Sequence, residues 1–111
     1  MPNLSFDEWS KLDIKTAEIV KAESIEGSDK LYKLKVDLGT ETRTIVSGLK
    51  AFYTKDELEG KKCILLLNLE PRKIMGIESQ GMILAASNGD FSEVKLLNAE
   101  GALELGSKIS W

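Results

Sequence analysis

The sequence predicts an all-β fold, a five-stranded Greek-key barrel that carries only two short helices. Apolar and polar residues alternate with a period of two through the middle of the chain, as in strands with one buried face. Helix-start signals occur twice, and each introduces only a short segment. With 111 residues the chain has room for one domain around one core. We expect a helical prefix over residues 1–11, the barrel over residues 12–87 and a C-terminal extension over residues 88–111.

Two capping boxes predict the helices. In a capping box, the first side chain accepts a hydrogen bond from the backbone three residues on, and the residue there returns the bond. Ser5 and Glu8 form one such pair, and Thr54 and Glu57 form the other. Gly60 then offers the left-handed backbone that ends a short helix. The second helix therefore falls between the third and fourth predicted strands.

Five segments have the patterns of strands. Residues 12–25 alternate irregularly, which indicates a long strand that bends and changes face. Residues 31–38 place apolar side chains on one face and charged ones on the other, and the β-branched residues 42–46 return as the second arm of a hairpin. Residues 63–67 and 82–86 are short apolar runs, which we interpret as buried strands.

This order of elements is that of an OB-fold, a partly open barrel that binds oligonucleotides on strands 2 and 3 and between two loops. In this chain the two loops are residues 25–30 and 69–81. The net charge of −3 disfavours a nucleic acid, but it is unevenly distributed. Residues 30–75 hold 10 basic and 6 acidic side chains, and the segments on either side are acidic. The middle of the chain can therefore offer a positive surface to a polyanion.

Composition excludes much of enzyme chemistry. The chain has no histidine, which removes the usual general base and the histidine-assisted nucleophiles. Its lone Cys63 lies in an apolar run and is interpreted as a buried hydrophobe. We expect no catalytic residue, no metal and no cofactor. No apolar run approaches the ~20 residues of a membrane span, and the N-terminus lacks the pattern of a secretory signal, so we expect a cytoplasmic protein without a membrane partner.

The scarcity of aromatic residues indicates which nucleic acid is bound. Proteins that hold single strands stack bases on exposed aromatic rings. The hairpin over residues 31–46 has only Tyr32, and its parity places it in the core. A structured RNA fits better, because its shape and backbone can be read without splayed bases.

Three segments together resemble the tRNA-binding domain family. They are DKLYKLKVDLG, IVSGLKAFYTKDELEGKK and, most specifically, NLEPRKIMGIESQGMILAAS, and the similarity extends from about Phe6 to Ile109. The family includes free-standing dimeric tRNA-binding proteins and the β-subunit or C-terminal module of methionyl-tRNA synthetases. The resemblance implies a homodimeric, non-catalytic protein that recognises tRNA by shape and backbone and serves an aminoacyl-tRNA synthetase such as methionyl-tRNA synthetase.

The resemblance also implies a set of RNA-binding residues. Arginine can fork onto a phosphate, lysine acts as a point charge, and serine or asparagine can bond a phosphate or a ribose 2′-hydroxyl. For Met82, packing of the thioether is an alternative to an RNA contact. The implied residues are Lys30, Lys33, Lys35, Asn68, Arg72, Lys73, Ser79 and Met82.

Two further expectations concern apolar residues. One branch of the family resembles a secretion chaperone, so a module that binds unfolded polypeptides is the alternative function, and Ile74, Met75 and Ile77 would supply its apolar groove.

The ends of the chain carry more apolar surface than a small barrel covers, which predicts a two-fold dimer built from both ends. These end residues are Phe6, Trp9, Leu103, Leu105, Ile109 and Trp111.

Overall fold

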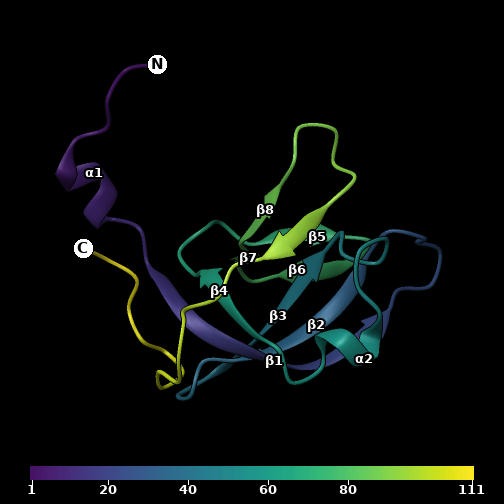
Figure 1. Ribbon diagram of the computed structural model, residues 1–111. Coiled ribbons are helices and arrows are strands. Elements are labelled where there is room, and N and C mark those ends of the chain that lie inside the picture. The colour runs from purple at the N-terminus through teal and green to yellow at the C-terminus, as the bar shows by residue number, and fades with distance from the viewer.

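A computed structural model describes all residues 1–111 and confirms the nearly all-β barrel with two short helices (Figure 1). The main sheet has five antiparallel strands in the order β3-β2-β1-β4-β7, and two separate hairpins, β5–β6 and β8–β9, extend from it. The helices are α1 (Phe6–Ser10) and α2 (Lys55–Leu58), and the strands are β1 (Ile14–Ser24), β2 (Tyr32–Asp37), β3 (Thr42–Ser47), β4 (Lys62–Leu66), β5 (Arg72–Ile74), β6 (Ile77–Ser79), β7 (Met82–Ile83), β8 (Ala85–Ser87) and β9 (Val94–Leu96).

Both predicted capping boxes are present. Ser5 and Glu8 exchange side-chain and backbone hydrogen bonds at the start of α1, and Thr54 and Glu57 do the same at the start of α2. The bonds from Thr54 to the Glu57 carboxylate lower the pKa of that group. Gly60 follows α2 with a positive φ of 88°, as expected. Neither helix has the length or the apolar character needed to cross a membrane.

The long first strand bends where its pattern of burial changes. The pairing of β1 with β2 shifts register between Ile19 and Lys21, which marks a bulge, so Val20 turns outward although its parity in the sequence predicts the core. Before the bulge β1 pairs with β4, and after it β1 follows β2 alone. One strand therefore serves both halves of the barrel.

Fourteen buried side chains form one core inside the barrel. Tyr32 is among them, as its parity predicts, and its hydroxyl donates to the carbonyl of Tyr53 at 2.9 Å. Cys63 is buried as well, and burial raises the pKa of its thiol to about 12. An unreactive cysteine follows, because the thiolate is the reactive form.

One predicted strand was wrong in extent and in burial. Residues 82–86 form two short strands, of which only Ile83 is buried, and Ala85 and Ala86 are exposed. The chain pairs with β4 as far as Ile83 and then leaves the barrel to pair β8 with β9. A short apolar run does not reveal this change of partner, because both halves look alike in sequence.

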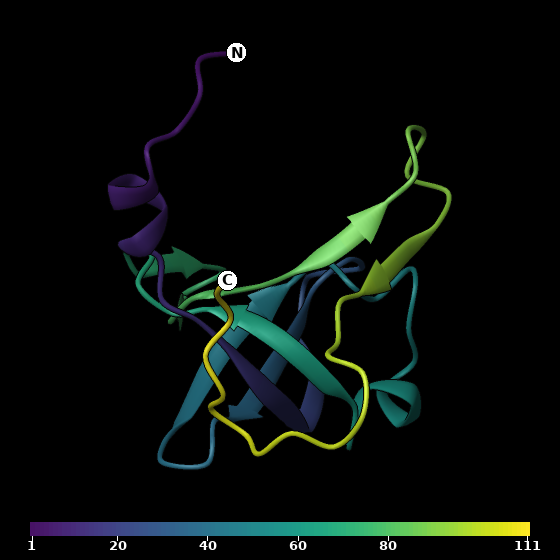
Figure 2. The same cartoon turned by 60° about the vertical axis from the view of Figure 1, so that its left-hand side comes forward.

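The β5–β6 hairpin lies within the segment that the sequence indicates as a loop, and it nearly closes the barrel against β3. The Gln80 N–H donates to the Thr44 carbonyl at 2.8 Å, and the Gln80 side-chain oxygen accepts from the Thr44 N–H at 2.9 Å. The Gln80 side chain thus takes the place of the second backbone carbonyl that a paired strand residue would supply. Val94 and Leu96 of the second hairpin, β8–β9, pack against the core, and the tip of this hairpin projects away from the barrel (Figure 2).

Candidate nucleic-acid interface

Strand pairing brings two predicted basic segments to one side of the barrel. Lys33 of β2 pairs with Val46 of β3. The Val46 N–H donates to the Ser79 hydroxyl of β6 at 3.0 Å, and Ser79 pairs with Arg72 of β5. Lys33 and Arg72 are distant in the sequence, yet only the edge of β3 and one strand of the hairpin separate them.

The predicted cations on this side have no carboxylate partner within 4.0 Å. The four ion pairs of the structure involve Lys15, Lys21, Arg43 and Lys62 instead. Lys33 is half-buried, and the other predicted cations are exposed. Glu23 lies across from Lys33 and Glu78 lies across from Lys73 in the strand register, but neither forms an ion pair with that lysine. The five cations still outnumber these carboxylates, and an excess of exposed positive charge suits a polyanion. We call the set the basic surface, and it consists of Lys30, Lys33, Lys35, Arg72 and Lys73.

The two loops that flank OB-fold binding sites meet beside this surface. A methyl group placed on Gly27 of the β1–β2 loop would lie 3.5 Å from Cε of Met75, at the tip of the β5–β6 hairpin. The Lys50 N–H donates to the Lys30 carbonyl at 3.2 Å, which holds the end of the same loop. The loops are thus positioned by packing and by backbone bonds.

Two predicted residues have their polar groups engaged within the protein. Ser79 is only 5% exposed, and its hydroxyl accepts from Val46 and donates to the carbonyl of Gly81 at 3.3 Å. Asn68 accepts from the Asp13 N–H at 2.8 Å and donates to the carbonyl of Lys11, joining the end of β4 to the α1–β1 junction. Their contact with RNA stays a prediction, and both already have a structural role.

Met82 lies beside the basic surface and is only partly covered by neighbouring side chains. It is 45% exposed on β7, and it lines a hollow of about 70 Å³ together with Arg72 and Ser79. The side chain is therefore accessible next to a predicted phosphate contact, and its role as an RNA contact stays a prediction.

Two lysines that the sequence analysis did not select extend the same side. Lys21 of β1 lies directly across from Lys35 of β2, a like-charge pair that does not favour folding. Its ion pair with Glu23, at 3.7 Å, is exposed and therefore weak. The backbone of Lys50 lies next to that of Lys30 through their hydrogen bond, so a second lysine is close to the site. Both contacts depend on register and loop packing, so no signal in the sequence reveals them.

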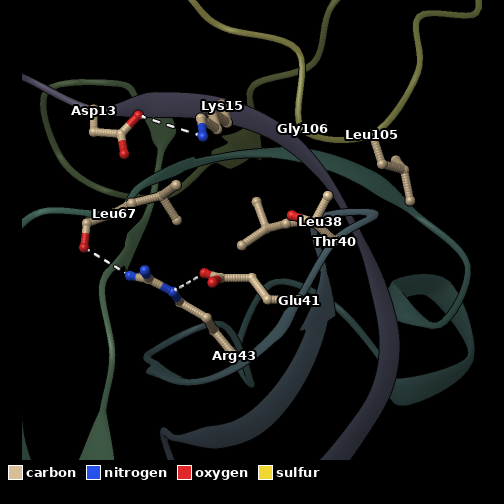
Figure 3. Close-up of a pocket in the computed structure, with 9 residues that line it drawn as sticks. All are labelled: Asp13, Lys15, Leu38, Thr40, Glu41, Arg43, Leu67, Leu105 and Gly106. Carbon is tan, nitrogen blue, oxygen red and sulfur yellow. Dashed lines mark hydrogen bonds and ion pairs between the residues drawn. The ribbon is translucent and has the colours of Figure 1, made fainter.

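A larger hollow of about 270 Å³ lies at another part of the barrel, beside the turn between β2 and β3 (Figure 3). There Arg43 donates to Glu41 at 2.6 Å and to the carbonyl of Leu67 at 2.7 Å, and Lys15 faces Asp13 at 4.0 Å. Because each cation has an acidic partner, this hollow is charge-compensated and is a weaker candidate for a polyanion.

No three His, Cys, Asp or Glu side chains are placed to hold a metal ion. A nearly closed antiparallel barrel with a cluster of exposed cations beside the β1–β2 loop and the β5–β6 hairpin is typical of OB-fold nucleic-acid-binding domains.

The particular family follows from comparison. Residues 14–108 match the family described as "Putative tRNA binding domain", and the chain belongs to that family. It is 50% identical over 107 residues to a methionine–tRNA ligase of Caldanaerobacter subterraneus subsp. tengcongensis, covering 96% of this chain. A methionine–tRNA ligase of Methanoculleus marisnigri is 53% identical over 109 residues. The chain spans about 16% of the length of each ligase.

Two solved structures resemble the whole chain. One is a MetRS-related protein from Pyrococcus horikoshii, with a TM-score of 0.92 and 40% identity, covering 99% of this chain and 100% of that one. The other is a CsaA chaperone protein from Picrophilus torridus, with a TM-score of 0.86 and 32% identity, covering 97% of this chain and 100% of that one. The resemblance to the tRNA-binding domain family is confirmed.

Proposed function

We propose that this chain is a non-catalytic module that binds tRNA through phosphates and overall shape. The observation that carries the proposal is the basic surface, whose five cations form no ion pair within 4.0 Å although the protein is acidic overall. Tyr32, the one aromatic residue of the β2–β3 hairpin, is buried and therefore offers no platform on which bases could stack. A double-helical RNA can be held in this way, because its backbone presents regularly spaced phosphates.

A competition assay tests this function. Labelled bulk tRNA is bound to the protein, and unlabelled folded tRNA or single-stranded polyuridine is added. Folded tRNA should displace the label, and polyuridine should do so poorly. Affinity should fall steeply as salt rises, because each phosphate contact releases counterions. Equal competition by polyuridine would contradict recognition by shape.

We further propose that the protein works in the cytoplasm as an auxiliary factor for an aminoacyl-tRNA synthetase, with methionyl-tRNA synthetase as the favoured partner. Identity of 50% to a segment of a methionine–tRNA ligase supports this choice. A module that retains tRNA should lower the KM of the ligase for tRNA without changing kcat. Adding the protein to a methionyl-tRNA synthetase and measuring aminoacylation at limiting tRNA tests the pairing.

The proposed assembly is a homodimer built from the two ends of the chain. The C-terminal segment runs beside β1, where Thr16 and Ile14 bond it through backbone and side-chain groups. Phe6 and Leu103 remain exposed on the prefix and on the C-terminal segment, and Trp111 is exposed at the end of the chain. Exposed aromatic and aliphatic side chains of this size are typical of an interface. Light scattering at tens of micromolar should give the mass of a dimer.

A polypeptide-binding module is the second candidate function. Two observations favour it: the 32% identity to a CsaA chaperone protein, and the position of Met75, 52% exposed between the half-buried Ile74 and Ile77. An unfolded polypeptide that displaced tRNA and protected Met75 from oxidation would favour this candidate. Displacement by folded tRNA alone favours RNA binding.

A further inference from the structure

The bulge in β1 turns one lysine toward the outer face of the barrel. Ahead of the bulge Ala17 and Ile19 are buried, so odd-numbered residues face the core there. After the register shift the even-numbered Ala22 is buried instead. Without the extra residue Lys21 would continue the inward series, and with it Lys21 is exposed. Bulges are common beside functional sites, where they redirect a side chain.

The redirected Lys21 lies directly across from Lys35 of β2. The Cβ atoms of residues paired in this way are about 4.5–5.5 Å apart, and like charges placed opposite each other disfavour the pairing of the strands. Both side chains are exposed, and Lys35 has no carboxylate within 4.0 Å. Folding therefore does not account for this pair of lysines, whereas an anion bound between them would replace the repulsion with attraction.

One carboxylate competes for the pair. Oε1 of Glu23 lies 3.7 Å from Nζ of Lys21, and both side chains are at least half exposed. An exposed ion pair of this kind contributes little, because water screens it and two long side chains must be ordered to form it. Glu23 also lies across from Lys33. The Lys21 ammonium is therefore free to take a stronger oxygen ligand.

The sheet places this pair next to the basic surface. Lys33 and Lys35 are two residues apart on β2, so their side chains leave the same face about 6.7 Å apart. On β3 their partners are Val46 and Thr44. β1, β2 and β3 are consecutive neighbours in the main sheet (Figure 1). An RNA that lies over β2 and β3 therefore reaches Lys21 by extending across one more strand.

We propose that Lys21 and Lys35 together hold one phosphate of the bound RNA, so that the binding surface crosses β2 and ends on β1. The inference rests on the tRNA binding proposed above and adds the strand on which the contacts end. Each ammonium group has three donors, and the two groups approach from adjacent strands, so each can bond a different oxygen of the same phosphate.

The variant Lys21→Gln of the full chain tests this contact. Titrations of bulk tRNA by fluorescence anisotropy should show an affinity about three- to tenfold lower near 0.1 M salt, with the slope of log affinity against log salt reduced by about 0.7 to 0.9. The variant should melt within about 3 °C of the wild type, because it removes a repulsion together with an exposed ion pair. Lys95→Gln, at an exposed position of β9, is the matched control and should change neither affinity nor slope.

A second variant removes the competing carboxylate. Glu23→Gln should tighten tRNA binding about twofold, because this carboxylate contacts Lys21 and lies across from Lys33. The gain should be smaller when Lys21→Gln is already present, since one of the two lysines is then absent. An equal gain in both backgrounds would contradict a phosphate contact by Lys21.

The outcome for Lys21 can be separated from that for the proposed function. If Lys21→Gln keeps the affinity and the salt slope of the wild type while the joint replacement of Arg72 and Lys73 by alanine weakens binding, the contact on β1 is wrong and tRNA binding stands. If the wild type does not bind tRNA, the proposed function fails and the contact fails with it.

Discussion

The two hairpins outside the main sheet have arms of equal length but differ in their connecting loops and in their settings. β5–β6 and β8–β9 both have three-residue arms, and each holds a large exposed side chain at positive φ, Met75 in one and Phe91 in the other. The first hairpin rests on β3 and carries Arg72 and Lys73. The second stands free beyond its base and has acidic residues around its tip.

The two hairpins thus differ in how firmly they are attached to the barrel and in the sign of the charge that they carry, although both are short antiparallel pairs. Ser79 at the end of β6 and the following Gln80 bond to β3 and help to close the barrel. The fold therefore determines where the β5–β6 hairpin lies relative to the basic surface. The tip of β8–β9 is organised only by its own bonds, which preserves its shape and leaves its surface available. The following variants test this contrast.

Gly81→Ala should have the largest effect. A methyl group there would lie 2.6 Å from the Leu66 carbonyl oxygen, at a φ of 137° that alanine adopts poorly. We expect a loss of about 3 kcal/mol in the free energy of unfolding, measured by urea denaturation. Gly89→Ala, in the free hairpin, has nothing within 4 Å and should change stability by less than about 0.5 kcal/mol. An equal loss of unfolding free energy in the two variants would contradict the view that β5–β6 is packed against the barrel and the tip of β8–β9 is not.

Replacing Arg72 and Lys73 together by alanine should weaken tRNA binding roughly 30-fold at 0.1 M salt. Each lost phosphate contact lowers the slope of log affinity against log salt by about 0.7 to 0.9. Titrations of fluorescence anisotropy at several salt concentrations measure both quantities. The control is the pair Lys55→Ala and Lys95→Ala, on α2 and β9, which should leave the slope unchanged. If the slope of log affinity against log salt were unchanged in the Arg72 and Lys73 variant, the basic surface would not be the binding site.

Ser79→Ala should destabilise the fold by about 1 to 2 kcal/mol, because the buried Val46 N–H loses its acceptor. The matching change in the other hairpin, Ser92→Ala, removes an exposed bond and should cost less than about 0.5 kcal/mol. Thermal melts compare the two. If Ser79→Ala kept full stability and lost tRNA affinity, a direct RNA contact by Ser79 would be favoured over its structural role.

Met75→Asn should stabilise the β5–β6 hairpin by about 0.5 to 1 kcal/mol. Met75 and Gly76 form a two-residue turn with φ of 53° and 78°, a geometry in which Asn-Gly is preferred. Urea denaturation measures the gain. A reduced affinity for tRNA or for an unfolded polypeptide in this more stable variant would show that the methionine serves binding.

The smallest expected effect concerns pH at the free tip. The Ser92 side-chain and backbone bonds lower the pKa of Asp90, so the ionised form is the one that folding favours. Its contribution is complete at neutral pH and is lost as the pH falls through the lowered pKa. The amide proton of Ser92 should shift in that acidic range in NMR spectra. The β5–β6 turn, which has no such aspartate, should not respond there.

The sequence indicated that the cations of the candidate site are accessible, but it did not indicate that Ser79 is buried. The lysines of β2 and the pair Arg72 and Lys73 are exposed or half-buried as charged residues usually are. The same segment carries Ser79, which looks equally polar in sequence but is buried by the hairpin it belongs to. Lys21 reaches the site only through its register with Lys35.

By itself, the sequence determined the elements whose signals are local. The two capping boxes, the alternating strand β2 and the buried Cys63 depend on neighbours within a few residues, and these predictions are confirmed. Only the tertiary structure decided where apolar segments leave the barrel. It separates β7 from β8 and places the Phe91 hairpin in solvent, because strand partners are chosen by long-range pairing that a short run of similar residues does not encode.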